Sequence, residues 1–409
     1  MSKATSITNK LLAMKFFSEF ILIYPLITIM FQTYGQVSAA GVGTILGLGL
    51  ALSVVFQIPT GIIADKIPRK YVLFGSIVFK ILALGLWLTV HNFTGYLVAA
   101  TLFAFSDASE SGTLEAYLYS ALGKDSKKDF GKFWARVSAM VMISYTVAYL
   151  LTTLLGVHYP LLIGLSIVPC LVALIICASL PLDSVQSSAK TDKPQIFSTA
   201  VKHIKSSPAL LQLIIGGVVI VALAKVMIEY LSLYYYQAGV SDRLVPVIMA
   251  MGNVLGAALF WSLHRWDTFL AKWRALILFV ASGLFILTFS TGVMSAVIGA
   301  MFYTRFIRLL QVQYDSSVQH LANEQARATI TSIGSFGSSL VGAVGMVLIG
   351  LFSHNNNVLT SIRVFLLVGA GAYILIQIMH ARPRATEQAP KPLTSYDEFV
   401  NGVTEKPVA

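Results

Sequence analysis

The sequence contains few charged residues. Only 11% of its 409 residues are Asp, Glu, Lys or Arg, whereas a soluble domain usually contains about 25%. A soluble chain of this length needs a large polar surface, so this composition excludes an ordinary soluble domain. With 56% hydrophobic residues and a mean hydropathy of +0.76, most of the surface is expected to face lipid.

Cysteines and catalytic motifs are also scarce. The only two cysteines, Cys170 and Cys177, lie in one apolar run, about 10 Å apart along a helix axis. That spacing excludes a disulfide between them and predicts two small buried side chains. No CxxC, HExxH or Walker-type motif occurs. We therefore expect no enzyme activity, no catalytic residue, no metal site and no cofactor.

Long apolar runs recur along the whole chain, each long enough to cross about 30 Å of hydrocarbon. Their length and lack of alternation indicate helices rather than barrel strands. They predict an all-α polytopic membrane protein with twelve transmembrane helices. The predicted spans are residues 11–34, 42–63, 71–90, 93–122, 133–155, 159–180, 210–236, 245–263, 273–289, 293–318, 329–351 and 358–379.

Lysine and arginine residues are concentrated in every second connection. The alternate connections contain a single one of them, Arg243. The positive-inside rule therefore places both termini of a multi-pass membrane protein in the cytoplasm. The net charge of +11 lies in these loops and tails rather than on one basic face, so we expect lipid contact and no nucleic-acid partner.

The longest connection divides the chain into two sets of six spans. We predict an N-terminal six-helix bundle at 1–182, a cytoplasmic central loop at 183–207 and a C-terminal six-helix bundle at 208–382. Residues 383–409 are polar and rich in proline, which predicts a disordered cytoplasmic tail.

The connection after the second span reads Gly61-Ile-Ile-Ala-Asp65-Lys66-Ile-Pro68-Arg69-Lys70. It resembles the loop signature of the major facilitator superfamily, Gly-x-Leu-Ala-Asp-Arg-x-Gly-Arg-Lys, with departures at residues 63, 66 and 68. The resemblance implies the major facilitator fold, in which two six-helix bundles surround a central cavity and work by alternating access as a monomer, without ATP. It also implies a conformational latch between the halves at Gly61, Asp65, Arg69 and Lys70. The alternative for Lys66 and Lys70 is that they only set the orientation of the chain in the membrane through the positive-inside rule.

The preceding Pro59-Thr60-Gly61 resembles bacterial efflux members of that superfamily, which implies a place in the bacterial cytoplasmic (inner) membrane. This favours a secondary active transporter that exports a small metabolite or drug-like solute, with protons as the second partner. The Gly-rich signature of drug–proton antiporters is missing from span five, which argues against a drug antiporter. The alternative is symport: proton-coupled uptake of an anionic nutrient or a siderophore-like metal chelate, favoured by the arginines of span ten.

Apart from Arg274 and Arg363, which lie near span ends, acidic and basic residues occur in equal number within the predicted spans. An isolated charge costs about 3 kcal/mol or more at mid-membrane, so these residues are expected to pair or to face a wet cavity. The superfamily resemblance implies that spans one, four, seven and ten line this cavity. The predicted solute- and proton-binding residues are Glu19, Asp107, Glu110, Lys225, Glu229, Arg305 and Arg308. Interhelical salt bridges between the same residues are the alternative.

Two of these spans show a polar face. Asp107, Ser111 and Glu115 recur at four-residue steps, and repulsion among the carboxyl groups of span four favours protonation of at least one. Arg305 and Arg308 of span ten can hold an anionic group bidentately. The remaining charges are predicted to be gating or structural, with Lys80 paired to an acid of span four. They are Lys15, Lys80, Glu115, Arg136 and Asp315.

Small residues also recur at helical spacing. Gly43 and Gly47 in span two, and Gly252 and Gly256 in span eight, form GxxxG pairs. Such pairs predict close approach of neighbouring helices.

Overall fold

The computed structural model describes residues 3–122, 130–182, 202, 204–288, 292–321 and 327–379, and the described part is helical. This confirms the predicted all-α class. Eight of the described helices are long and apolar enough to cross a membrane. The elements are α1 (Lys3–Ser18), η1 (Tyr24–Leu26), α2 (Ile27–Thr33), α3 (Ala39–Lys66), α4 (Arg69–Thr89), α5 (Phe93–Glu110), α6 (Thr113–Leu122), α7 (Phe130–Leu155), α8 (Tyr159–Ala178), α10 (Pro208–Gln237), α11 (Val245–Leu287), α12 (Val293–Leu321), α13 (Arg327–Leu351) and α14 (Leu359–Met379).

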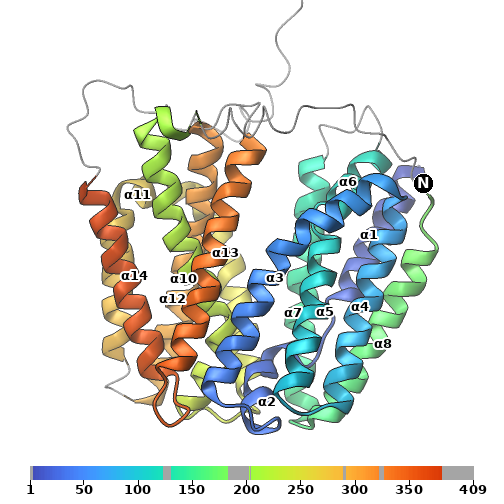
Figure 1. The fold of residues 1–409 in the computed structure, drawn as a ribbon, viewed down its shortest axis with the longest axis horizontal. Helices are drawn as coiled ribbons and strands as arrows, with labels where there is room; N and C mark the ends of the chain where they lie inside the picture. The colour runs from blue at the N-terminus through green and yellow to red at the C-terminus, as the bar shows by residue number, and fades with distance from the viewer. Residues whose placement is uncertain are drawn as a thin grey trace, which may run out of the picture.

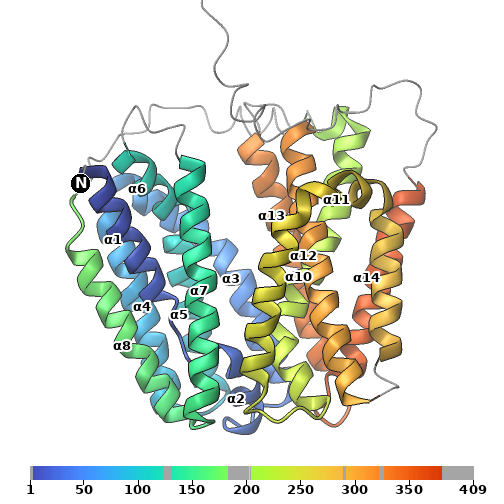
Figure 2. The same ribbon diagram turned by 180° about the vertical axis from the view of Figure 1, so that it is seen from behind.

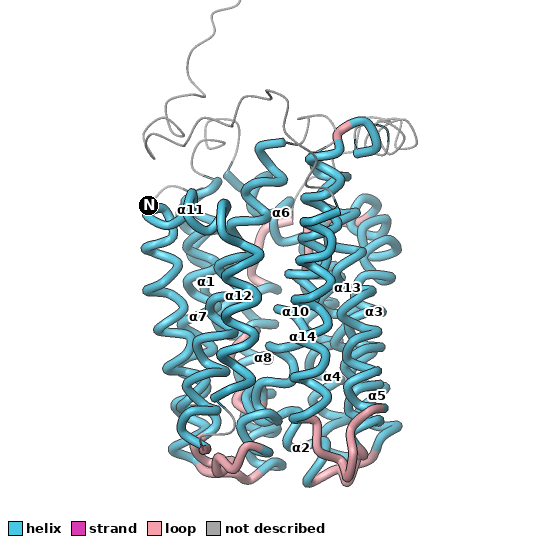
Figure 3. Tube along the Cα trace, turned by 90° about the vertical axis from the view of Figure 1, so that its left-hand side faces the viewer, coloured by secondary structure: helices cyan, strands magenta, loops and turns pink. Residues whose placement is uncertain are grey.

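The helices form two groups, α1 to α8 and α10 to α14 (Figures 1 and 2). Within the first group α4 packs on α5 and α8, and within the second α10 packs on α12, α13 and α14. The groups meet through α3 against α13 and α7 against α11. They diverge toward the end at which the chain begins and come together at the end where α2 lies (Figure 1). Most loops lie at these two ends (Figure 3).

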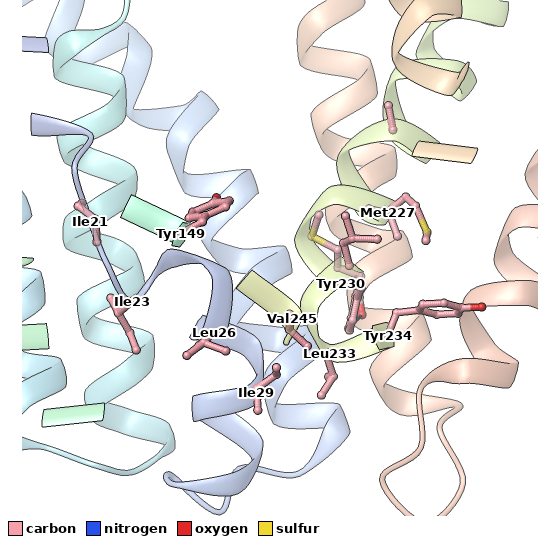
Figure 4. Packing of buried hydrophobic residues seen from close by; sticks show 14 of the residues in the cluster. Ile21, Ile23, Leu26, Ile29, Tyr149, Met227, Tyr230, Leu233, Tyr234 and Val245 are labelled. Carbon is pink, nitrogen blue, oxygen red and sulfur yellow. Dashed lines mark hydrogen bonds between the residues drawn. The ribbon is translucent and has the colours of Figure 1, made fainter. Parts of the chain in front are cut away.

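The first predicted span is not one continuous helix. Helix α1 ends at Ser18, and the helical path resumes only at η1, which begins next to Pro25. Proline lacks an N–H group and disfavours the α conformation of the residue before it, which explains an interruption at this point. Figure 4 shows the unwound stretch with Ile21 and Ile23 on it.

Side chains of neighbouring helices satisfy the backbone groups that this break frees. The N–H of Leu22 donates to the Ser166 hydroxyl at 2.9 Å, and its carbonyl accepts from Thr152 at 2.7 Å. The Phe16 carbonyl accepts from the Ser144 hydroxyl at 2.7 Å. Non-helical backbone at membrane depth is tolerated only with such partners.

The fourth predicted span is also interrupted. Helix α5 ends at Glu110 and α6 begins at Thr113, because Gly112 adopts a φ of +72°. A glycine in the left-handed region is a common helix terminator. The Thr60 hydroxyl of α3 donates to the Ala108 carbonyl at this helix end, at 3.1 Å. The prediction that this span is one regular helix is therefore wrong.

Spans eight and nine form one helix, α11, that bends instead of ending. The expected loop between them is helical, with non-helical angles only at Trp273 (φ −109°, ψ 16°). No proline or glycine occurs at residues 264–272 to stop the helix. Figure 2 shows the two legs of α11 joined by this bend.

The glycine pair of span two lies at the interface between the halves. A Cβ atom at Gly43 would collide with the Met346 carbonyl oxygen of α13. A Cβ at Gly47 would lie 2.6 Å from the Ala343 carbonyl oxygen. This confirms the close helix approach predicted for α3. Both cysteines are buried and free, as predicted.

Candidate functional site

A cavity of about 610 Å³ lies between the two halves, within the range of about 300–1,000 Å³ that is usual for small-molecule sites. Its lining comes from α1, α5, α6 and α7 on one side and from α10, α11 and α12 on the other. The charged residues that line it were all singled out in the sequence. They are Lys15, Asp107, Glu110, Glu115, Arg305 and Arg308.

An ion network joins four charges of the first half. The Lys15 ammonium lies 2.7 Å from Oε1 of Glu19 and also contacts the Glu110 carboxylate. The Lys80 ammonium lies 3.0 Å from the same oxygen of Glu19. Two cations thus neutralise two carboxylates, which is what allows such groups to be buried. The predicted pairing of Lys80 with span four is wrong, because its ion-pair partner in the described chain is Glu19 on span one.

Two carboxylates of the cavity stay outside this network. Asp107 and Glu115 are exposed to the cavity. Among the described residues, neither carboxylate has a hydrogen-bond or ion-pair partner. Ser111 also lines the cavity. Asp107, Ser111 and Glu115 therefore all line one cavity, although span four is interrupted between α5 and α6.

Arg305 extends along the face of α11 that the second glycine pair leaves open. A Cβ at Gly252 would lie 2.7 Å from Nη2 of Arg305, and one at Gly256 would lie 3.2 Å from its Cδ. The glycines of span eight therefore make room for a side chain rather than for a helix backbone. The Nε of Arg305 is buried and has no hydrogen-bond partner among the described residues.

Several predicted site residues lie beside the cavity instead of lining it. Glu19 is buried and accepts a hydrogen bond from the Tyr145 hydroxyl at 2.7 Å. Lys225 contacts the hydroxyl of Ser339, at 2.6 Å. Glu229 is exposed and interacts electrostatically with Asp107 and Arg308.

Two predicted gating charges also lie away from the lining. Arg136 is exposed, with its guanidinium 5.5 Å from the centre of the Phe133 ring. Asp315 is exposed and interacts electrostatically with Lys225.

The latch motif lies at the end where the halves diverge. A Cβ at Gly61 would meet no atom of the described residues within 4 Å, so no neighbouring helix packs against the motif at this position in this conformation. Asp65 and Arg69 each interact with other groups. Lys70 donates to the Ala178 carbonyl at 2.7 Å, where a cation favourably meets the last carbonyls of α8.

Sequence reasoning missed the aromatic and amide residues of the cavity. Tyr145 and Tyr149 of α7 stack with ring centres 6.1 Å apart, and both line the cavity together with Trp134 and Asn253. Their four-residue spacing was visible in the sequence, but nothing there showed that this face of span five is inward. The fold and the cavity define the class of protein as a polytopic α-helical membrane protein with a central cavity between two halves.

The chain matches the model of the Major Facilitator Superfamily over residues 11–346 and belongs to that superfamily. This membership confirms the predicted all-α major facilitator fold. It is 21% identical over 271 residues to YxaM of Bacillus subtilis (strain 168), described as an uncharacterized MFS-type transporter. That match covers 64% of this chain and 65% of the relative, which is just under two thirds of the relative's length.

Solved structures of transporters share the fold. A nucleoside transporter, NupG, superposes with a TM-score of 0.71 at 14% identity, covering 93% of this chain and 98% of that one. The peptide-transporter-family protein PepTSo gives 0.71 at 11% identity, with coverage of 93% and 99%. A D-xylose–proton symporter gives 0.67 at 13% identity, with coverage of 92% and 97%.

Proposed function

We propose that this protein is a proton-coupled antiporter that exports a small metabolite, with Asp107 as the proton-carrying group. The main support is the difference between the two neighbouring acids of α5. Glu110 is held in an ion pair by Lys15, whereas Asp107 faces the cavity without a partner among the described residues. An unpaired carboxyl group in a cavity can bind and release a proton as the cavity changes sides.

The charge pattern of the loops supports export as the direction of transport. If the basic loops are cytoplasmic, the end at which the halves diverge faces the cytoplasm (Figure 1). The conformation then corresponds to a cytoplasm-facing state that loads a solute from inside the cell. A proton and a cationic group cannot occupy the same carboxylate together, and such competition produces exchange.

Proton-coupled uptake of an anionic nutrient or metal chelate is the second candidate. The cavity face of α12 carries Arg305 and Arg308, and guanidinium groups bind carboxylates and phosphates bidentately. Under this alternative, solute and proton move in the same direction.

The test is proton movement in liposomes that contain the full chain and a trapped pH-sensitive dye. The probes are L-phenylalanine, uridine, D-xylose and ethidium, each added under an imposed pH gradient. Antiport predicts that at least one probe moves protons opposite to itself, and that Asp107→Asn abolishes the proton movement. Asp242→Asn, the same acid-to-amide change in the connection between α10 and α11 and outside the cavity lining, is the control and is expected to retain it. Movement of protons and probe in the same direction would support uptake. Probe flux that changes neither with the pH gradient nor with Asp107→Asn would refute proton coupling.

A further inference from the structure

The unpaired charges of the cavity are separated by sign. On the first half, Asp107 and Glu115 line the cavity, and we call them the acidic wall. On the second half, Arg305 and Arg308 of α12 form the arginine wall. Lys15 and Glu110 contribute no net charge, because they pair with each other. The charges of the lining residues thus sum to zero, with a negative side and a positive side. Glu229 lies beside the lining on the second half and interacts electrostatically with Arg308, without an ion pair between them among the described residues.

The two walls do not neutralise each other directly. In the described part of the chain, no ion pair joins either arginine to an acid of the first half. The Arg305 Nε is buried without a hydrogen-bond partner. Buried polar groups normally have partners, so this donor beside the cavity is free to hydrogen-bond to an anionic group or a water.

The arginine is held in place by the backbone around it. Gly252 and Gly256 leave a groove on α11 that the Arg305 side chain fills. A side chain restricted in this way loses little conformational entropy when an anion binds to it. The preceding Thr304 and the nearby Asn253 also line the cavity and add polar groups to this side.

Apolar and aromatic side chains make up much of the rest of the lining. Tyr145, Tyr149 and Trp134 of α7 line the cavity with Leu231 and Met249 of the other half. Aromatic rings offer a large contact area to a flat or apolar solute body. The site therefore combines the acidic wall, the arginine wall and an apolar surface.

We propose that the transported solute is a small zwitterion with an apolar or aromatic body, whose cationic group faces the acidic wall and whose anionic group faces the arginine wall. This inference rests on the proposed transport function. A solute with only one charged group would leave the opposite wall unpaired in a site of low dielectric constant, which is costly. A solute with both groups satisfies both walls.

The test compares probes that share a phenyl group and differ in which charged groups they carry. L-phenylalanine has both groups, 2-phenylethylamine has the amine alone and 3-phenylpropanoate has the carboxylate alone; L-alanyl-L-phenylalanine is a longer zwitterion. Binding to the purified full chain is measured by calorimetry at concentrations up to about 10 mM, so that millimolar affinity is detected. We expect one zwitterion to bind at least about tenfold more tightly than either single-charge probe, a difference of about 1.4 kcal/mol.

Two variants test which wall binds which charged group. Arg305→Gln is expected to remove the tighter binding of L-phenylalanine relative to 2-phenylethylamine. Asp107→Asn is expected to remove its tighter binding relative to 3-phenylpropanoate. Asp242→Asn, outside the cavity lining, is the control and is expected to change neither ratio. Equal or tighter binding of a single-charge probe, or no binding of either zwitterion, would overturn the inference. If such a single-charge probe still drives proton movement in liposomes, the transport function stands and only the solute class is wrong.

Discussion

Gln237 of α10 donates a hydrogen bond from Nε2 to Oε1 of Gln32 of α2, at 2.7 Å, and so ties the two halves together. The carbonyl of Asn356 accepts from both glutamines, at 2.8 Å each. The side chain of Asn356 also accepts from the N–H of Ala39 at 3.0 Å. This amide cluster (Gln32, Gln237 and Asn356) closes one end of the molecule without any ion pair among its members.

Loss of the amide cluster is expected to weaken that closure. Gln237→Leu removes the bonds to Gln32 and Asn356 and should shift the population toward conformations open at that end by several-fold, since each bond contributes about 1 kcal/mol. Distances between spin labels on α2 and α10 measure the shift. Gln377→Leu is the matched control, because among the described residues the Gln377 side chain bonds to Gln212, within one half. Equal shifts in both variants would contradict a gating role.

The contact of α3 with α13 predicts a sharp difference between two glycines. Gly43→Ala introduces a methyl group that meets the Met346 carbonyl, so it should lower thermal stability or prevent the closed end from forming. Gly75→Ala on α4 meets nothing within 4 Å and should be neutral or slightly stabilising, because alanine favours helix. Thermal unfolding in detergent compares the two, and a Gly43→Ala protein as stable as Gly75→Ala would argue against tight packing.

The hydroxyl that supports the broken first span can be tested on α7. Thr152→Val leaves the Leu22 carbonyl without its hydrogen bond and is expected to destabilise the fold by about 1–3 kcal/mol. Among the described residues, the Thr146 hydroxyl donates to the Met142 carbonyl, within its own helix. Thr146→Val should therefore cost little. Denaturant unfolding of the two variants gives the difference, which is expected to exceed the experimental error clearly.

The buried ion network predicts a non-additive pair of substitutions. Lys80→Met leaves Glu19 with one cation fewer and should destabilise the protein by about 3 kcal/mol or more. Adding Glu19→Gln removes the uncompensated charge and leaves Lys15 paired with Glu110. The double variant is expected to be more stable than Lys80→Met alone. Additive losses in thermal unfolding would show that these charges are not coupled.

Some features of the site were accessible from the sequence. The helical spacing of Arg305 and Arg308, and the acids of span four, identified residues that do line one cavity. Two interruptions were missed because hydropathy measures how apolar a segment is and does not measure backbone conformation. Pro25 and Gly112 were visible as helix-breaking residues, and each stands at or beside a break.

By itself the sequence determined that this chain is a helical membrane protein of two similar-sized halves. Lipid demands long apolar segments, and only a helix satisfies its own backbone groups in hydrocarbon. Tertiary structure alone decided which charges are neutralised and which remain unpaired at the cavity. Glu110 and Asp107 are three residues apart, yet only Glu110 meets a lysine. The partner of a buried charge depends on distances between helices, and the order of residues does not encode those distances locally.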